Sequence, residues 1–462
     1  MTGATPAVFD AIDPATRRPF STIPERSPAD VEAAVAAGRA AHRASLWRVP
    51  ANRARALAAI ARAVEAHGDE LAELECRDTG KPISQARADV AATVRYFDFY
   101  AGAADKLLGT SIPLGPGFVD FTVREPWGVC GQIIPWNYPM QVLARCAAPA
   151  LAAGNAVVLK PSEQGSVTPL RIAELSREAG LAEGLLSVVT GHGPVGASLV
   201  DADVDFVTFV GSAAVGRQVA SAAAQRLAPV QLELGGKSPN VVFADADLER
   251  AVPAIVASLI QNAGQSCSAG SRVIVDATVA GELVSRVSEA MGAVTIGPGI
   301  EDHQLGPLIS ERQLQRAEEM LERARGDGVT VVRGGGRPAG LGDGWYLEPT
   351  VLTGVREGTE IFEEEVFGPV LAITVFADEA EAIRLANATP YGLVAAVWSR
   401  DISRAHRVAG DVQAGQVYIN GYGVAGGIEL PFGGMKRSGY GRGKGIEAML
   451  SYSQVKNVCV VL

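Results

Sequence analysis

Apolar residues recur at helical spacing through the first part of the chain and later form short runs separated by helices. Residues 28–75 carry apolar positions at helical intervals after Ser27-Pro28, which predicts helix. From about Gly128, strands are predicted for GVCGQIIPW, NAVVLKPS, LLSVVTG, DFVTFVGS and PVQLELGGK. Helices are predicted between them, for example over TPLRIAELSREAGL and from Ala213. This alternation predicts βαβ units in a parallel sheet.

A second alternation of strands and helices starts after Gly236. NVVFAD, the helix LERAVPAIVASLIQNAG and SRVIVD come first, and VTVVRGG, YLEPTVLTGV, PVLAITVFA and LVAAVWSR follow. Residues 112–125 look extended, and the final YSQVKNVCVVL alternates like a strand. Because no local partner is evident for this terminal strand, we expect it to pair with another subunit. The pattern predicts an α/β protein with two parallel sheets.

The length and composition of the chain exclude several classes of protein. A chain of 462 residues is too long for one simple core, so at least two domains are expected. The net charge of −10 disfavours nucleic acid as a partner. No apolar run reaches membrane-spanning length and the N-terminus has no secretion signal, so we expect a cytoplasmic protein without a membrane partner. The five cysteines form no CxxC pair and the five histidines are scattered, so reduced thiols and no metal are expected.

Two stretches carry candidate catalytic groups. Cys267 follows a polar, glycine-containing loop, Gln261-Asn-Ala-Gly-Gln-Ser, which is unusual for a core cysteine. Glu233 lies among apolar residues at a predicted strand end, before Gly-Gly-Lys237, where desolvation would raise its pKa and make it a base. Taken alone, Cys267 is also compatible with a small buried core residue, and Glu233 with an exposed carboxylate.

Three further stretches have the character of binding sites. Asn137 is fixed in Ile134-Pro-Trp-Asn-Tyr-Pro, so its amide can act as a rigid hydrogen-bond donor. Lys160 and Glu163 follow an apolar strand, where ligands collect in open α/β sheets. Gly211-Ser212 joins a strand to a helix and predicts an anion site of backbone N–H groups.

A glycine motif elsewhere is a weaker signal. Gly191-His-Gly193-Pro-Val-Gly196 matches GxGxxG after the predicted strand LLSVVT. Pro194 interrupts it, and no acidic residue follows a strand at the usual distance. We do not interpret it as the standard dinucleotide fingerprint.

Together, these stretches resemble the aldehyde dehydrogenase superfamily. The resemblance continues through Glu363-Glu-Glu365-Val-Phe367-Gly-Pro, Val417-Tyr-Ile-Asn420 and Pro431-Phe432-Gly-Gly, and covers almost the whole chain. It implies two Rossmann-like domains and a small β domain. The implied division is a coenzyme-binding domain (1–108 and 128–234), a catalytic domain (235–440) and an oligomerisation domain (109–127 and 441–462) of a homodimer or homotetramer.

The resemblance also implies roles for individual residues. Cys267 matches the nucleophile, Glu233 the general base and Asn137 the side-chain donor of the oxyanion hole. NAD is the implied cofactor, and NADP stays open because Lys160 could offset the repulsion of a 2′-phosphate by Glu163. The implied cofactor-binding residues are Ile134, Trp136, Lys160, Glu163, Gly193, Gly211, Ser212, Glu365 and Phe367.

The implied reaction is oxidation of an aldehyde to its acid through a thioester on Cys267, which Glu233 helps water to hydrolyse. A coenzyme A-acylating dehydrogenase and a non-catalytic member of the fold are the alternatives. Glu233 argues against the first, and the intact set of Cys267, Glu233 and Asn137 against the second.

The substrate is expected to contact Tyr138, Arg145 and Phe432. Arg145 stands where succinate semialdehyde dehydrogenases carry an arginine for the substrate carboxylate, although Gln261 stands where they often have a second one. We therefore expect a carboxylate-bearing semialdehyde, or else a medium aliphatic or aromatic aldehyde; the alternative is a structural role for Arg145. Gly443 stands where relatives often have a proton-relaying Glu, which puts such a relay in doubt.

Overall fold

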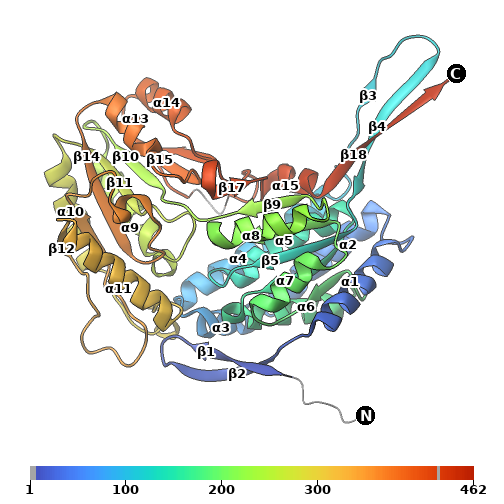
Figure 1. Cartoon of the computed structure of the whole chain (residues 1–462), viewed down its shortest axis with the longest axis horizontal. Coiled ribbons are helices and arrows are strands. Elements are labelled where there is room, and N and C mark those ends of the chain that lie inside the picture. The colour runs from blue at the N-terminus through green and yellow to red at the C-terminus, as the bar shows by residue number, and fades with distance from the viewer. Residues whose placement is uncertain (1–6, 424–426) are drawn as a thin grey trace.

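The computed structural model describes residues 7–423 and 427–462 as two α/β lobes, with a β arm projecting from one of them (Figure 1). The sheet of the first lobe has the strand order β7-β6-β5-β8-β9-β17. Its first five strands are parallel, and β17 adds antiparallel to β9. The strands are β5 (Val129–Ile134), β6 (Ala156–Pro161), β7 (Leu186–Val188), β8 (Phe206–Val210), β9 (Val230–Glu233) and β17 (Gly439–Tyr440).

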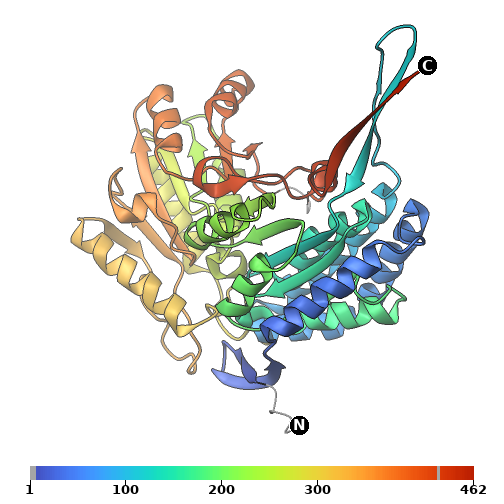
Figure 2. The same ribbon diagram turned by 45° about the vertical axis from the view of Figure 1, so that its right-hand side comes forward.

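Helices cover both faces of this first sheet (Figures 1 and 2). Nearly every residue of α5 is buried, because it lies between the sheet and the outer helices α2, α4 and α6. The helices are α1 (Pro28–His42), α2 (Pro50–Ala66), α3 (Gly68–Thr79), α4 (Ile83–Ala103), α5 (Pro139–Ala153), α6 (Val167–Glu178), α7 (Gly193–Asp201) and α8 (Ala213–Ala224).

The second lobe contains a seven-stranded sheet of order β12-β13-β14-β11-β10-β15-β16, parallel except for β12. Its strands are β10 (Pro239–Val242), β11 (Arg272–Asp276), β12 (Thr330–Arg333), β13 (Thr350–Thr353), β14 (Val370–Phe376), β15 (Val394–Trp398) and β16 (Gln416–Ile419). Its helices are α9 (Leu248–Ile260), α10 (Ala280–Gly292), α11 (Glu311–Gly326), α12 (Glu360–Glu363), α13 (Glu379–Asn387) and α14 (Ile402–Asp411). The predicted α/β class with two parallel sheets is confirmed.

The arm gives the C-terminal strand a partner within its own chain. The C-terminal strand β18 (Ser453–Val461), which follows α15 (Gly445–Ser451), pairs along its whole length with β4 (Phe118–Pro126) of the same chain. A short strand, β3 (Ser111–Ile112), pairs with the other edge of β4. Local patterning did not reveal this partner, because the two segments are over 300 residues apart in sequence. Pairing of the terminal strand with another subunit stays a prediction.

Two features of the fold were not predicted from the sequence. An N-terminal hairpin of β1 (Val8–Asp13) and β2 (Arg18–Pro24) lies at the edge of the molecule, and α4 packs against α2 and α5. The division into domains at residue 234 stays a prediction, which the boundary between the two sheets supports. Among the described residues, no helix has the length and apolar character needed to cross a membrane.

Parallel strands place their carboxyl ends at one edge of the first sheet, where ligands bind in open α/β folds. Three of these strand ends lead directly into predicted site residues. β5 ends at Ile134, three residues before Asn137, β8 ends just before Gly211, and Glu233 is the last residue of β9. The topology therefore brings together side chains that are about 100 residues apart in sequence.

Candidate active site

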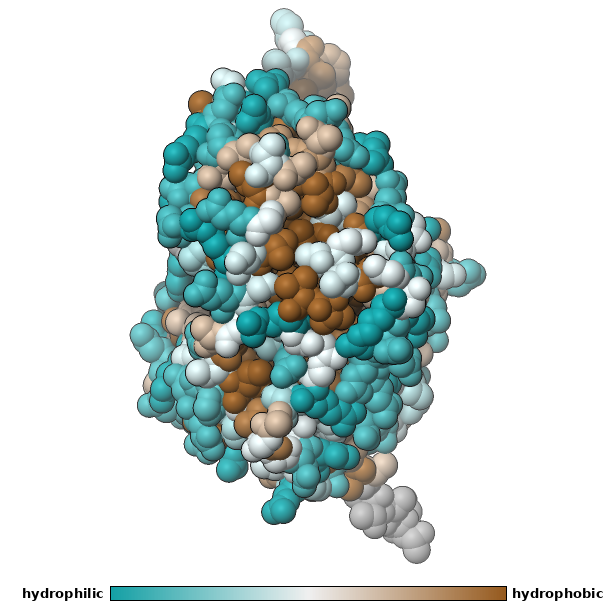
Figure 3. Space-filling model, turned by 90° about the vertical axis from the view of Figure 1, so that its left-hand side faces the viewer, coloured by the Kyte–Doolittle hydropathy of each residue, from teal (hydrophilic) through white to brown (hydrophobic). Residues whose placement is uncertain are grey.

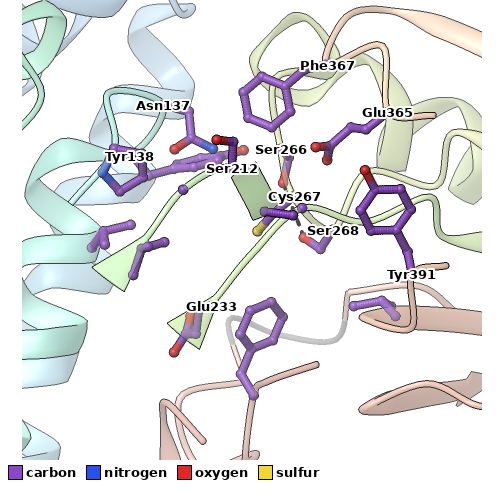
Figure 4. A pocket seen from close by; sticks show the side chains of 18 of the residues that line it. Asn137, Tyr138, Ser212, Glu233, Ser266, Cys267, Ser268, Glu365, Phe367 and Tyr391 are labelled. Atoms are coloured by element: carbon purple, nitrogen blue, oxygen red, sulfur yellow. Dashed lines mark hydrogen bonds between the residues drawn. The ribbon is translucent and has the colours of Figure 1, made fainter. Parts of the chain in front are cut away.

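A cavity of about 630 Å³ lies between the lobes. Cys267, Glu233 and Asn137 all line it, as Figure 4 shows, with Cys267 near the middle. Its wall also includes the other predicted site residues Trp136, Tyr138, Arg145, Gly211, Ser212, Glu365, Phe367 and Phe432. Ile134, Lys160, Glu163 and Gly193 do not line this cavity.

The loop before Cys267 has an unusual backbone. Asn262, Ala263 and Gly264 have φ angles of +49°, +53° and +75°, so three consecutive residues are left-handed. A side chain at Gly264 would lie 2.2 Å from the carbonyl oxygen of Gly368. Such a conformation costs energy and persists only where its surroundings fix it.

Hydrogen bonds supply that fixation. The Asn262 amide donates to the backbone carbonyl of Asn137 at 2.8 Å, and the Asn262 N–H donates to Oε1 of Gln85 at 2.8 Å. Gln265 donates to the Asn262 carbonyl and accepts from the N–H of Ile309. The loop therefore holds Cys267 in a defined place relative to Asn137.

The side chain of Asn137 is also fixed. Its Nδ2 donates to the carbonyl of Gln265 at 2.9 Å, which leaves the second N–H of the amide available to a ligand. Its backbone carbonyl accepts from Nζ of the buried Lys81 at 3.0 Å. Asn137 thus presents a preorganised donor beside the cysteine.

The thiol of Cys267 is half-buried and unfavourably placed for ionisation. Burial raises its pKa to about 11, although the positive charge of Arg145 acts in the opposite direction. Lys444 also lowers this pKa, and the carboxylates of Glu365 and Glu233 raise it. In this arrangement the thiol is neutral at pH 7.

Glu233 is buried and has a charged partner. Its Oε2 lies 2.6 Å from Nη2 of Arg145, and Oε1 accepts from Nε2 of Gln231 at 3.3 Å. A side chain at Gly443 would begin 2.2 Å from Oε1. The space that a side chain at position 443 would need is therefore occupied by the carboxylate of Glu233. Burial excludes the exposed-carboxylate interpretation of Glu233.

Arg145 lies in the cavity wall and stacks on Phe432, with Cζ 5.3 Å from the ring centroid. Because a nitrogen of its guanidinium is engaged by Glu233, binding of a substrate carboxylate by Arg145 stays a hypothesis. Lys444, which the sequence did not single out as a site residue, places Nζ 5.1 Å from the centroid of the same ring. The signal in the sequence that could have drawn attention to Lys444 is the unusual glycine at the adjacent position 443.

Another part of the cavity wall carries three of the predicted cofactor-binding residues. Trp136 and Phe367 meet edge to face with centroids 5.3 Å apart. The carboxylate of Glu365 accepts from the N–H of Gly236 at 3.1 Å, and burial raises its pKa to about 7. Phe367 adopts a φ of +60°, a strained conformation of the kind that clusters at functional sites.

Three of the remaining predicted cofactor residues lie at or after the carboxyl ends of β6, β7 and β8. Ser212 caps α8 and accepts from the N–H of Val215 at 3.4 Å. Nζ of Lys160, at the end of β6, lies 3.8 Å from the Glu163 carboxylate. Gly193 begins α7, and a side chain there would meet nothing within 4 Å. In the sheet, the strands that precede α7 and α8, namely β7 and β8, are separated by β6 and β5.

Comparisons with known proteins agree with this arrangement. Residues 1–458 match the aldehyde dehydrogenase family. The chain belongs to that family. A curated betaine aldehyde dehydrogenase of Cereibacter sphaeroides is 44% identical over 99% of this chain and 94% of its own length. The predicted family resemblance is therefore confirmed, and with it the oxidation of an aldehyde as the type of reaction.

Solved aldehyde dehydrogenase structures share the fold. A protein of Burkholderia cenocepacia whose crystal structure is described as that of an aldehyde dehydrogenase is 47% identical to this chain, with a TM-score of 0.97. The match covers 98% of this chain and 96% of that chain. The NAD+ complex of an aldehyde dehydrogenase from Bacillus cereus is 39% identical with a TM-score of 0.96, covering 99% and 94%.

Several residues contact the site without having been predicted, and two lysines are among them. Lys444 lines the cavity, and Nζ of Lys81 donates to the backbone carbonyl of Asn137. Lys81 lies in the motif Asp78-Thr-Gly-Lys-Pro, whose single lysine gives no sign in sequence that it will be buried.

Proposed function

We propose that this protein oxidises an aldehyde to the carboxylic acid with Cys267 as nucleophile, Asn137 as oxyanion donor and Glu233 as general base. The observation that supports it is the convergence of these three side chains on one cavity between the lobes. A nucleophile, a fixed amide donor and a buried carboxylate are the groups that this chemistry requires.

The donor set fits NAD as the cofactor. A carboxylate at Glu163 beside Lys160 suits ribose hydroxyls, and the capped start of α8 at Ser212 suits a diphosphate. Trp136, Phe367 and Glu365 would hold the nicotinamide riboside. NAD, when bound, supplies the acceptor for the hydride that leaves the substrate carbon.

In the first step, the sulfur of Cys267 attacks the aldehyde carbon, and the carbonyl electron pair moves onto oxygen. The free N–H of the Asn137 amide donates to this oxygen; one such donor typically contributes about 3 kcal/mol. Because the Cys267 thiol is neutral at pH 7, its proton must leave to solvent before the sulfur attacks.

Loss of hydride leaves a thioester on Cys267. Glu233 then takes a proton from water, and the resulting hydroxide attacks the thioester carbon. The carbon–sulfur bond breaks, and the acid and the thiol form. Gly443 leaves the space that the Glu233 carboxylate occupies. The presence of this base favours hydrolysis over transfer to coenzyme A.

The experiment that tests this function combines turnover with intact-protein mass spectrometry. We expect Cys267→Ala to abolish NADH formation with any aldehyde. Glu233→Gln should give at most one equivalent of NADH and a protein mass increased by the acyl group. Rapid turnover by Cys267→Ala, or steady-state turnover by Glu233→Gln without acyl-enzyme, would contradict the assignment.

The substrate belongs to this proposal too. We infer a carboxylate-bearing semialdehyde, with medium aliphatic or aromatic aldehydes as the alternative, from the cationic and aromatic wall of Arg145 and Phe432. Betaine aldehyde, the substrate named for the Cereibacter relative, carries a quaternary ammonium group. The ammonium of Lys444, which lies over the Phe432 ring, disfavours such a group.

We also infer a homo-oligomer. The arm sheet has the order β18-β4-β3, and it exposes apolar side chains, among them Phe118, Val455 and Val461. Among the described residues the outer edge of β18 is unpaired, and such an edge favours pairing with another chain. Figure 3 shows that apolar residues also gather in the middle of one face of the molecule. Light scattering after size exclusion should give a dimer or tetramer mass.

A further inference from the structure

Lys444 occupies a defined position in the cavity wall. Its neighbour Gly443 exchanges two backbone hydrogen bonds with Phe432, both of 2.6 Å. This bridge holds the Lys444 side chain against the face of the Phe432 ring. Lys444 is half-buried and lines the same cavity as Cys267. The fold therefore fixes the position of the Lys444 side chain, unlike that of a lysine that moves freely on the surface.

The charge of Lys444 has no counterion within the described residues. Three carboxylates line the cavity, and each has another partner. Glu233 pairs with Arg145, Glu364 accepts from the hydroxyl of Tyr391, and Glu365 accepts from a backbone N–H. No ion pair or side-chain hydrogen bond involves Lys444 in residues 7–423 and 427–462, and Val424-Ala-Gly has no acidic side chain. A half-buried ammonium without a counterion favours an anionic ligand.

The surroundings of Lys444 suit the body of a small organic molecule. Phe432 packs in a cluster with Leu393 and Val394, against which Cys267, Tyr418 and Tyr422 also pack. This apolar cluster connects the nucleophile to the ring on which Lys444 lies. Arg316, Arg217 and Arg437 also line the cavity, but all three are exposed.

We propose that Lys444 binds the carboxylate of the substrate, so that the preferred aldehydes carry an anionic group separated from the aldehyde by a short apolar chain. This inference rests on the proposed function and assigns the specificity of the same cavity. It differs from recognition by Arg145, whose guanidinium charge is matched by Glu233. The apolar chain packs against Phe432, and the aldehyde carbon reaches Cys267.

Steady-state kinetics with Lys444→Met tests the proposal, using succinate semialdehyde, butanal and betaine aldehyde with NAD. A charge-assisted hydrogen bond predicts that KM for the semialdehyde rises about tenfold or more, while KM for butanal changes less than about twofold. Betaine aldehyde, which Lys444 repels, should show an unchanged or lower KM. Lys444→Arg keeps the charge and should retain most of the preference for the semialdehyde.

Lys456→Met is the matched control, because Lys456 pairs with Glu125 on the exposed arm and its loss should leave all three KM values unchanged. Equal effects of Lys444→Met on the semialdehyde and butanal would overturn the carboxylate assignment but leave the proposed function intact. A wild-type enzyme that prefers betaine aldehyde would also overturn it. Wild-type protein that oxidises none of the three would count against the proposed function. In that case, binding of succinate by calorimetry, weakened in Lys444→Met, still tests the anion site.

Discussion

The guanidinium of Arg145 lies 2.6 Å from the carboxylate of Glu233, and both side chains are buried. This ion pair connects α5, which packs against the first sheet, to the last residue of β9. It gives the proposed base a fixed position, and it prevents a buried carboxylate and a buried guanidinium from standing alone.

Removal of one member of this pair should destabilise the protein. Arg145→Met leaves the Glu233 carboxylate buried without a cation, and we expect a loss of about 3–5 kcal/mol in the free energy of unfolding. Urea denaturation followed by circular dichroism measures it. The double variant Arg145→Met with Glu233→Gln should recover much of that loss. Equal stabilities of the single variant and wild type would show that the pair contributes little.

The pKa of Cys267 predicts how its alkylation depends on pH. Burial raises that pKa to about 11, so the reactive thiolate is scarce at neutral pH. The rate of iodoacetamide labelling of the cofactor-free protein should rise about tenfold per pH unit between pH 7 and 9, without reaching a plateau there. Cys459 is exposed, so Cys459→Ser removes its background. A plateau near pH 8 would mean a much lower pKa.

Lys81 should affect catalysis through Asn137. Its Nζ lies 3.2 Å from Glu75 and 2.5 Å from Asp89, and it donates to the Asn137 carbonyl. Lys81→Met leaves two buried carboxylates near each other, so we expect a destabilisation of about 3–5 kcal/mol. Since Asn137 would lose a backbone contact, kcat should fall at temperatures where the variant remains folded. Exposed Lys106, replaced by Met in the same way, is the control. An unchanged kcat in Lys81→Met would show that Lys81 stabilises the fold without positioning Asn137 for catalysis.

Gly443→Ala should slow hydrolysis of the thioester. Its Cβ would lie 2.2 Å from Oε1 of Glu233 and would displace the carboxylate. Overpacking of this kind costs about 1–3 kcal/mol, and a shifted base should slow deacylation about tenfold. Stopped-flow measurements should then show a burst of NADH before slow turnover. Gly342→Ala, where a Cβ meets nothing within 4 Å, is the control. Wild-type rates in Gly443→Ala would mean that Glu233 tolerates the shift.

Recognition of an anionic substrate by Lys444 has its own pH dependence. Burial, with the nearby Arg145, lowers the pKa of Lys444 to about 8, whereas Glu233 and Cys267 act in the opposite direction. Because the ammonium is required, kcat/KM for succinate semialdehyde should fall relative to butanal as pH rises through about 8. The ratio of the two values cancels effects of pH on chemistry common to both substrates. A ratio that stays constant from pH 7 to 9 would contradict the proposal.

The sequence predicted both parallel sheets because apolar runs and turns are local signals. It also placed Cys267, Glu233 and Asn137 correctly at loop and strand ends, where topology brings them into one cavity. It could not predict that Arg145 pairs with Glu233, because that contact joins residues 88 apart whose charges have many other potential partners. The same applies to the pairing of β18 with β4, and to Lys81, whose burial depends on how three helices pack.

The position of β17 has a mechanical consequence. The chain leaves the first sheet after Glu233, builds the second lobe, and returns to add Gly439–Tyr440 beside β9. The chain therefore crosses between the lobes in two separate segments. The returning segment contains β17, which is hydrogen-bonded to β9, the strand that ends in Glu233. A hinge made of one crossing could swing open, whereas a double crossing resists torsion and wide gaping. Entry and exit of reactants are then expected to depend on local movements of side chains and loops, with the frame around Cys267 and Glu233 staying nearly constant through the catalytic cycle.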